Sequence, residues 1–325
     1  MRAFVLSDRD GTFSQGVTDV ADPVAGSDET LIRVEFSGIN FKDTMVAASP
    51  SRVRRRDELV GGVDAAGLVI ASDRFAAGTP VVVYGGTVGT GRDGGFAELI
   101  AAPNRYVSAL PAPLTTRQAM IAGTAGFTAM QSILALEHAG LTPGGEVLVT
   151  GATGGVGSMA VVFLARRGYR TVASTGSEAH RAWLMGLGAA EVIGRSEIDD
   201  RSERVLSPER WDGAVDCVGG TTLHHILRSL RYGAAVAASG LVASAELATT
   251  VYPFITRHVS LLGIDSVEVP SDERTTVWNA LAAMADSVPW ETLVHDEIGL
   301  AALPDALDVV RRGDSRGRYL VNPGA

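Results

Sequence analysis

The sequence contains almost no cysteine and almost no lysine. Cys217 is the only cysteine among 325 residues, which excludes an internal disulfide and any zinc site with several thiolate ligands. Its apolar neighbours predict a buried strand and an inert thiol, because burial disfavours the reactive thiolate. Lys42 is the only lysine beside 27 arginines. An ammonium group and a guanidinium group are not interchangeable at a compact site, so Lys42 is a candidate functional residue; chance survival in an arginine-rich chain is the alternative.

Membrane segments and a basic surface are missing as well. No apolar run approaches the ~20 residues of a membrane-spanning helix, and the N-terminus lacks a signal-peptide pattern. The net charge of −9 argues against binding to nucleic acid or to an anionic membrane. We therefore expect a cytoplasmic protein without nucleic-acid or membrane partners. The length of 325 residues, of which 46% are hydrophobic, is sufficient for two domains.

The segment 146–157, with the sequence EVLVTGATGGVG, is the strongest single indication of function. It predicts a buried strand and a glycine-rich turn that opens a helix, where free N–H groups can bind phosphate. The pattern is a dinucleotide-binding fingerprint whose first glycine is replaced by Ala152. We expect Gly154 to allow the sharp turn. We expect Gly155 and Gly157 to let a pyrophosphate and the neighbouring strand come close.

The pattern of apolar residues divides the chain into two kinds of structure. Before residue 118, glycine and proline separate short strands, as in a small β-barrel-like domain. After it, helices and strands alternate, which predicts an α/β fold with a doubly wound parallel sheet. The expected strands are 2–6, 31–36, 67–71, 79–84 and 96–101 in the first part, and 147–150, 171–174, 191–193, 213–218, 234–239 and 259–264 in the second. Helices are expected at 118–137, 158–167, 273–285 and 303–312, and a final strand at 318–321.

Five further segments carry a resemblance to a known family. They are 40–43 (NFKD), 62–67 (GVDAAG), 123–130 (GTAGFTAM), 249–255 (TTVYPFI) and 263–267 (GIDSV). Together with the glycine-rich loop, they resemble the zinc-independent quinone oxidoreductase branch of the medium-chain dehydrogenase/reductase superfamily, and within it the acrylyl-CoA reductase (NADPH) group. The resemblance implies a GroES-like catalytic domain formed by residues 1–117 and 267–325, with a Rossmann dinucleotide-binding domain inserted at 118–266.

Zinc alcohol dehydrogenases of this superfamily bind their metal through residues that this chain lacks. Asn40 stands where the first cysteine ligand would be, and Val63 stands where the histidine would be. The adjacent His224 and His225 would point about 100° apart on a helix, and we expect them at the surface. We therefore expect no metal. Members of the zinc-free branch add hydride to the β-carbon of an activated alkene, and hydrogen-bond donors can stabilise the charge that develops on the carbonyl oxygen.

The residues after the second strand of the Rossmann domain indicate NADPH. An NAD site usually has an acidic residue there, which binds the ribose 2′-hydroxyl group. This chain has Thr175, Gly176 and Ser177 instead. The resemblance assigns Arg195 to the 2′-phosphate, with Arg181 as a second candidate; the alternative is that both arginines only solvate the surface. Family members commonly have an arginine where Ser177 stands, so the strength of the preference for NADPH is open at this point.

Candidate catalytic residues follow an expected strand of the first domain. Asn40 could donate a hydrogen bond to the substrate carbonyl or orient a ribose hydroxyl. Lys42 could donate to the enolate or pair with Asp43, and Asp64 could hold the network together. The alternative is that Lys42 and Asp43 form an ordinary surface ion pair. Family members commonly have tyrosine where Phe41 stands, so the proton would come from water or Lys42.

Four arginines follow in an expected loop, and the resemblance implies further contacts. Arginine forks suit the phosphates of coenzyme A, although a solvated charged loop is the alternative. The resemblance also implies that apolar residues contact the cofactor; for these residues and for Phe254, packing in the protein core is the alternative. A strand at 260–264 could pair with a second copy to give a homodimer. The arginines are Arg52, Arg54, Arg55 and Arg56, and the implied cofactor contacts are Phe41, Thr128, Gly154, Gly155, Val156, Gly157, Thr175, Gly176, Ser177, Arg195, Gly240, Leu241, Ile255, Ser266 and Arg318.

These expectations combine into one favoured function, NADPH-dependent reduction of the C=C bond of a short enoyl thioester such as acryloyl-CoA. A quinone or enal/enone reductase with the same hydride chemistry is the nearest alternative. A protein that binds NADPH without catalysis is the third, because fold alone does not decide function.

Overall fold

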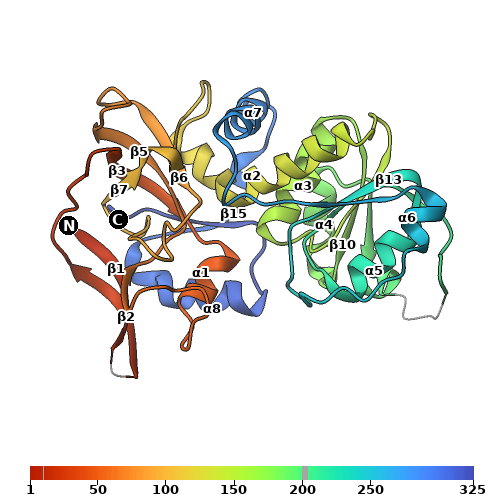
Figure 1. Cartoon of the computed structure of the whole chain (residues 1–325), viewed down its shortest axis with the longest axis horizontal. Coiled ribbons are helices and arrows are strands. Elements are labelled where there is room, and N and C mark those ends of the chain that lie inside the picture. Colours follow the sequence, from red (N-terminus) through yellow and green to blue (C-terminus); the bar gives the residue numbers. More distant parts are fainter. Residues whose placement is uncertain (10, 200–203) are drawn as a thin grey trace. The chain divides into compact units, whose positions relative to one another are not determined.

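The structure, a computed structural model, describes residues 1–9, 11–199 and 204–325 (Figure 1). The chain folds as two compact units. Unit 1 comprises Met1–Thr124, Ser266–Asp286 and Trp290–Ala325, and unit 2 comprises Ala125–Asp265 and Ser287–Pro289.

Unit 1 contains two sheets. The larger one has seven strands in the order β15-β16-β3-β5-β6-β8, with β7 paired to β3, and the smaller one has the order β2-β1-β4. The pair β15–β16 is parallel, and the other pairs are antiparallel. The strands are β1 (Arg2–Arg9), β2 (Thr12–Asp19), β3 (Glu29–Gly38), β4 (Glu58–Val60), β5 (Asp64–Ala71), β6 (Pro80–Tyr84), β7 (Leu99–Pro103), β8 (Val107–Ala109), β15 (Val294–Ile298) and β16 (Arg318–Val321), and the helices are α1 (Phe41–Val46), α7 (Ser271–Ala282) and α8 (Leu303–Arg312).

Apolar side chains from both sheets stabilise unit 1. One cluster includes Ile32 and Val81, and another joins Phe4 and Phe96 to Leu303 of α8. Burial of such side chains contributes about 1.5–3 kcal/mol each. Helix α1 follows β3 after two residues, Ile39 and Asn40, and carries two of the four candidate catalytic residues, Lys42 and Asp43.

The sequence pattern misses β2 for a physical reason. This strand, TFSQGVTD, is polar at most positions and largely exposed, so it shows no apolar alternation. It is held by backbone pairing along the whole of β1 instead. The expected strand 96–101 lies further along the chain, at Leu99–Pro103, whereas the final strand 318–321 is observed as predicted.

Unit 2 is a six-stranded parallel sheet in the order β11-β10-β9-β12-β13-β14. The connections run outward from β9 and β12 in opposite directions, so the predicted doubly wound sheet is confirmed. Right-handed crossovers place α3 on one face and α5 on the other (Figure 1). The strands are β9 (Glu146–Val149), β10 (Arg170–Thr175), β11 (Glu191–Gly194), β12 (Trp211–Asp216), β13 (Leu230–Ala238) and β14 (Ser260–Gly263), and the helices are α3 (Gly155–Arg166), α4 (Arg181–Leu187), α5 (Gly220–Ser229) and α6 (Tyr252–Arg257).

Helix α2 (Thr116–His138) is broken at Gly123, whose φ of 53° and ψ of −159° suit glycine almost alone. The first segment of unit 1 ends at Thr124, the residue after this break. The domain division expected after residue 117 stays a prediction. Within the described part of the chain, α2 is the one helix long and apolar enough to cross a membrane. However, 83% of its most apolar window is buried inside the protein, which is typical of a core helix.

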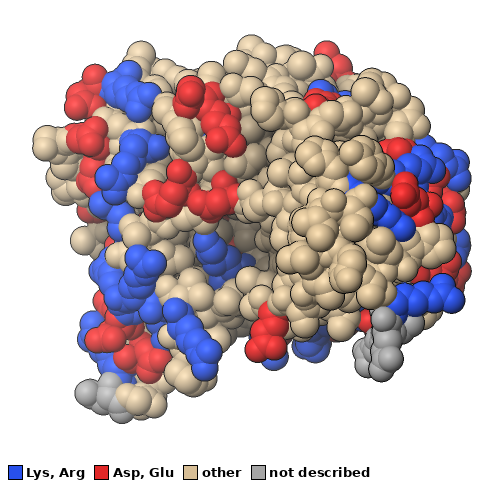
Figure 2. Space-filling model, turned by 45° about the vertical axis from the view of Figure 1, so that its right-hand side comes forward, with Lys and Arg blue, Asp and Glu red and all other residues tan. Residues whose placement is uncertain are grey.

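Charges of both signs are mixed on the face that Figure 2 shows. Basic and acidic groups lie close together there, with wide uncharged areas between them. Many of the charged side chains form ion pairs, for example Arg117 with Glu291 at 2.8 Å. Basic groups follow one another down the left-hand side of this face, with acidic groups among and beside them.

Candidate active site

The glycine-rich loop leaves β9 and opens α3. Its left-handed residue is Gly151, with φ of 58°, whereas Gly154 is extended (φ −74°, ψ 174°) and is the N-cap of α3. The prediction that Gly154 makes the sharp turn is therefore wrong, because the positive φ falls at Gly151. The helix also begins at Gly155 rather than at Ser158.

Position 157 requires glycine, because the structure leaves no room there for a side chain. A Cβ atom there would lie 2.3 Å from the carbonyl oxygen of Gly151 and 2.7 Å from the Cα atom of Ala152. The loop therefore packs directly on the first turn of α3, which includes Gly155 and Val156. The N–H groups of this turn have no partner within the helix, so the loop has the form of a phosphate-binding site.

Arg195 lies over the turn that ends β10. A Cβ atom on Gly176 would be 2.7 Å from Nη2 and 2.9 Å from Cζ of Arg195, so the guanidinium group rests on this glycine. The N–H group of Ser177 donates to Oγ1 of Thr175 at 3.0 Å and holds the turn. Arg195 is exposed, and it forms no ion pair within residues 1–9, 11–199 and 204–325.

Arg181, in contrast, is occupied. Its Nε donates to Glu178 at 2.8 Å, and its Nη1 donates to the carbonyl oxygen of Val192 at 2.8 Å. The structure therefore separates the two arginine candidates, and Arg195 is the one with a free guanidinium fork.

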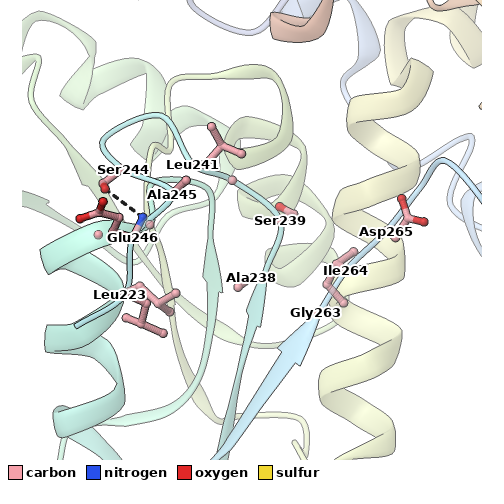
Figure 3. Close-up of a pocket in the computed structure, with 14 residues that line it drawn as sticks. Leu223, Ala238, Ser239, Leu241, Ser244, Ala245, Glu246, Gly263, Ile264 and Asp265 are labelled. Carbon is pink, nitrogen blue, oxygen red and sulfur yellow. Dashed lines mark hydrogen bonds between the residues drawn. The ribbon is translucent and has the colours of Figure 1, made fainter. Parts of the chain in front are cut away.

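A cavity of about 530 Å³ lies at the carboxyl ends of β12, β13 and β14 (Figure 3). Gly240 and Leu241 line it, as the resemblance implied for a cofactor site. Gly240 has no room for a side chain, because a Cβ atom would lie 2.0 Å from the carbonyl oxygen of Cys217. Ile255 on α6 is 72% exposed and does not line the cavity, and Phe254 packs against the core of unit 2.

Three other predicted cofactor contacts, Thr128, Phe41 and Ser266, are not among the residues that line this cavity. Thr128 is buried within α2, and its carbonyl oxygen accepts a hydrogen bond from Ser132. Phe41 is 41% exposed at the start of α1, and Ser266 is half-buried where the chain returns to unit 1.

In unit 1 a buried network joins Asn40, Asp64 and Arg318. Nδ2 of Asn40 donates to Oδ2 of Asp64 at 2.8 Å, and Nη1 of Arg318 donates to Oδ1 of Asn40 at 3.0 Å. The amide is therefore oriented from both sides, and one of its N–H groups remains for a ligand. Arg318 was predicted as a cofactor contact, but it is only 3% exposed and belongs to this network.

Backbone groups complete the network. Nη1 of Arg318 also donates to the carbonyl oxygen of Ile39 at 2.7 Å, and the N–H group of Thr124 donates to Oδ2 of Asp64 at 2.8 Å. Nη2 of Arg318 lies 3.8 Å from Oδ2 of Asp64. Burial lowers the pKa of Arg318, and the charges of Asp64 and Asp43 oppose that shift.

Two glycines make room for the ion pair. A Cβ atom on Gly123 would lie 2.6 Å from Nη2 of Arg318 and 2.8 Å from Oδ2 of Asp64. A Cβ atom on Gly38 would lie 2.8 Å from the same nitrogen. The segment GTAGFTAM, which only suggested a family, thus has a physical role at its first residue.

Asp43 is not paired with Lys42. Its carboxylate accepts the backbone N–H groups of Asn40 at 2.7 Å and Val63 at 3.0 Å, and the residue is 2% exposed. The surface-ion-pair alternative is therefore wrong. Lys42 is half-buried on α1 and forms no ion pair with any described residue. Burial, and then the charge of Asp64, raise the pKa of Asp43 to about 7.

This raised pKa predicts a specific pH dependence of stability. Between about pH 4 and pH 7, the Asp43 carboxyl is ionised in the unfolded chain but still protonated in the folded one, so the folded state binds more protons. The free energy of unfolding of the wild type, minus that of Asp43→Asn, should fall across this window by at most about 4 kcal/mol. Urea titrations at several pH values measure it. If this difference in the free energy of unfolding instead rose with pH, the two N–H donors and Arg318 would together favour the ionised form of the Asp43 carboxyl group.

The side chains at the zinc positions of related dehydrogenases do not fit a metal. Asn40 offers an amide already bonded on both sides, and Val63 is apolar and 5% exposed. Among the described residues, no group of three or more His, Cys, Asp or Glu side chains could hold a metal ion. His224 and His225 are half-buried on α5 rather than at the surface. The chemistry available at Asn40 is hydrogen bonding.

The four loop arginines have different environments. Arg54 is structural, since it pairs with Asp8 at 2.7 Å and donates to the carbonyl oxygen of Val46 at 2.7 Å. Arg56 pairs with Asp93 at 3.2 Å. The two that are exposed and without an ion pair in the described chain are Arg52 and Arg55.

Cys217 is half-buried after β12. Burial, and then the charge of Asp216, raise the pKa of the Cys217 thiol to about 12. The raised pKa agrees with the predicted inert thiol, whereas the predicted buried strand is wrong at this residue, because β12 ends at Asp216.

The chain is similar to known oxidoreductases along its whole length. The alcohol dehydrogenase GroES-like domain profile matches residues 26–112, and the zinc-binding dehydrogenase profile matches residues 155–283. YhfP of Bacillus subtilis, which carries a quinone oxidoreductase name, is 44% identical over 297 residues covering 90% of each chain. The acrylyl-CoA reductase AcuI of Ruegeria pomeroyi is 41% identical over 300 residues covering 91% of each chain.

Two solved structures share the fold closely. The yhdH oxidoreductase from Salmonella enterica, in complex with NADP, superposes with a TM-score of 0.93 at 38% identity, covering 99% of both chains. Bacillus subtilis yhfP with NAD bound superposes with a TM-score of 0.94 at 42% identity, covering 99% of this chain and 98% of the other. The two neighbours hold different dinucleotides, so the choice of cofactor depends on this chain's own residues.

Proposed function

The chain belongs to the zinc-independent quinone oxidoreductase branch of the medium-chain dehydrogenase/reductase family, and on that premise we propose that it reduces the C=C bond of a short enoyl thioester with NADPH. Acryloyl-CoA, which would yield propanoyl-CoA, is the proposed substrate. Support comes from the relatives named for acrylyl-CoA reduction and from the side chains that replace the metal ligands.

The residues of unit 2 fit a dinucleotide. The first turn of α3 would hold the pyrophosphate, and the cavity at Gly240 and Leu241 would take part of the nicotinamide half. Arg195, which forms no ion pair with described residues and lies over Gly176, would bind the 2′-phosphate. When bound, NADPH supplies the hydride that is transferred to the β-carbon of the alkene.

The observation that carries the proposed reaction is the orientation of the Asn40 amide. Arg318 holds its oxygen and Asp64 holds its nitrogen, so the remaining N–H group is fixed before any substrate binds. A thioester oxygen that gains negative charge as hydride reaches the β-carbon is stabilised by such a preorganised donor. This assigns Asn40 to the carbonyl oxygen and makes Asp64 and Arg318 its positioning residues.

The α-carbon must then receive a proton. Phe41 has no hydroxyl group and cannot supply it. Lys42, on the same helix and without an ion pair in the described chain, is the proposed donor, and water is the alternative. The balance is one hydride and one proton added across the C=C bond, with the thioester unchanged.

Arg52 and Arg55 are proposed to bind phosphates of coenzyme A. Arg54 fixes their loop through Asp8 and leaves these two side chains exposed. Replacing both by glutamine should raise the KM for acryloyl-CoA about tenfold, because each of the two lost ion pairs with phosphate is exposed to solvent and contributes at most about 1 kcal/mol. The KM for a small enone without phosphates should stay unchanged. Steady-state kinetics with both substrates measures this.

Arg33→Gln is a suitable control for the two loop arginines. Arg33 is also exposed and forms no ion pair with described residues, but it lies on β3. It should leave both KM values unchanged. Equal increases for the enone and for acryloyl-CoA in the loop variant would refute phosphate binding.

A quinone reductase is the second candidate function, favoured by the 44% identity to YhfP. One set of assays tests both: NADPH oxidation with acryloyl-CoA, with a small enone and with a quinone, beside a titration of cofactor binding. The proposal requires the highest kcat/KM for acryloyl-CoA. Tight NADPH binding without turnover of any of the three would instead indicate a non-catalytic protein.

We also propose that two copies pair through β14. This strand ends the sheet of unit 2, so one of its backbone edges lacks a neighbour in that sheet. Pairing about a two-fold axis would continue the sheet into a second copy.

A further inference from the structure

Asp216 is a buried carboxylate that the proposed reaction does not use. It ends β12 and is 0% exposed. Three donors converge on it: Oγ1 of Thr150 at 2.6 Å, the N–H group of Gly219 at 2.9 Å and the N–H group of Val218 at 3.3 Å. It forms no ion pair with a described residue, so these hydrogen bonds alone offset the cost of burying the group.

The donors belong to two turns at the carboxyl edge of the sheet. Thr150 directly precedes Gly151, where the glycine-rich loop takes its positive φ. The hydroxyl oxygen of Thr150 also accepts the N–H group of Cys217 at 3.0 Å, which ties the loop to the end of β12. The hydroxyl group that Asp216 holds thus adds a side-chain tie to the backbone bonds of this loop, in which the N–H groups of Thr150 and Ala152 donate to the carbonyl oxygens of Val215 and Ser174, each at 3.1 Å.

The second turn leads from β12 into α5. Gly219 has φ of 74°, and a Cβ atom on it would lie 2.4 Å from the carbonyl oxygen of Ser244. The N–H group of Ala243 donates to the carbonyl oxygen of Val218 at 2.9 Å. This turn is therefore packed against the segment that lines the 530 Å³ cavity, to which Gly219 and Ser244 themselves belong.

We propose that Asp216 is the positioning residue of the dinucleotide site: through Thr150 it sets the glycine-rich loop, and through Gly219 it sets the wall of the cavity. The inference rests on the proposed function, because it requires a dinucleotide at this edge of the sheet. Asp216 need not touch the cofactor. It couples the two halves of the site, so that a change at either turn alters cofactor binding.

Thr150→Val tests the coupling, because it removes the hydroxyl group and keeps the shape of the side chain. The Kd and KM for NADPH should rise about tenfold, while kcat at saturating NADPH stays within about twofold. Thr150→Ser keeps the hydroxyl group and should bind NADPH like the wild type. Asp216→Asn should weaken binding at least as much as Thr150→Val, because its NH₂ group must face one of three donors.

Ile226→Val separates positioning from general destabilisation. Ile226 is a fully buried core residue of unit 2 on α5, so the substitution lowers Tm without touching either turn. It should leave the Kd for NADPH unchanged. If both Thr150→Val and Asp216→Asn bound NADPH with a Kd within twofold of wild type, whatever the Tm of these variants, the positioning role of Asp216 would be overturned and the proposed function would not. A wild-type protein that binds neither NADPH nor NADH would overturn the proposed function together with it, and titration without substrate distinguishes the two results.

Discussion

Asn40→Ala is expected to lower kcat for enoyl reduction by about 100- to 1,000-fold, which is the usual loss when one preorganised oxyanion donor is removed. The alanine cannot hold the carbonyl oxygen, and Asp64 and Arg318 lose the amide between them. The KM for NADPH should change little, since the glycine-rich loop belongs to unit 2. Steady-state kinetics, with Tm as a check on folding, measures both effects.

Ser37→Ala is the matched control for this variant. Ser37 is fully buried and donates to the backbone carbonyl oxygen of Asp64 at 2.6 Å, but it has no group directed at a substrate. It should lower Tm and leave kcat within about threefold, since hydrogen bonds of this kind contribute about 1 kcal/mol to stability. If Asn40→Ala and Ser37→Ala lowered kcat equally, the amide would be a structural group rather than a catalytic one.

Arg195→Gln is expected to raise the KM for NADPH by about 10- to 100-fold and to leave the KM for NADH unchanged. The lost contacts are charge-assisted hydrogen bonds to the 2′-phosphate, each contributing about 1.5–3 kcal/mol, and NADH has no such phosphate. Kinetics with both cofactors at fixed salt concentration measures the selectivity.

Arg181→Gln serves as the comparison, because Arg181 is engaged with Glu178 and Val192. It should leave the ratio of the two KM values near that of the wild type. If the Arg181 variant lost NADPH selectivity and the Arg195 variant did not, the two assignments would have to be exchanged. A wild type that prefers NADH would refute the NADPH assignment, and the NAD bound to yhfP makes that comparison essential.

Periodicity predicted the elements whose side chains are buried in a regular pattern. The parallel strands of unit 2 and the terminal strand Arg318–Val321 are of this kind, because apolar runs between glycine-rich turns have few other solutions. β2 was missed because its stability comes from backbone pairing with β1, which leaves no mark on the side chains. The exact start of α3 was missed because its first three residues, GVG, show no helical spacing of apolar side chains.

The site could be predicted only in part. Asn40 and Asp64 were found through family motifs, but nothing in the sequence shows that Arg318, 254 residues after Asp64, completes their network. The sequence does carry a signal at Asp216, namely a carboxylate that directly follows the uncharged residues Gly213–Val215 of β12. The distinction between Arg181 and Arg195 was out of reach, because it depends on a hydrogen bond to a main-chain carbonyl.

The break at Gly123 decides where this chain can be cut. Thr124 gives its main-chain N–H group to the buried Asp64, so the folded state of unit 1 depends on an amide that lies past the start of α2. A fragment designed to end at residue 117, where the sequence suggested a domain boundary, would lack both Thr124, which donates to that carboxylate, and Arg318, its ion-pair partner. A fragment or a fusion point intended to preserve unit 1 therefore has to retain the first turns of α2 and the glycine within them, even though the rest of that helix belongs to unit 2.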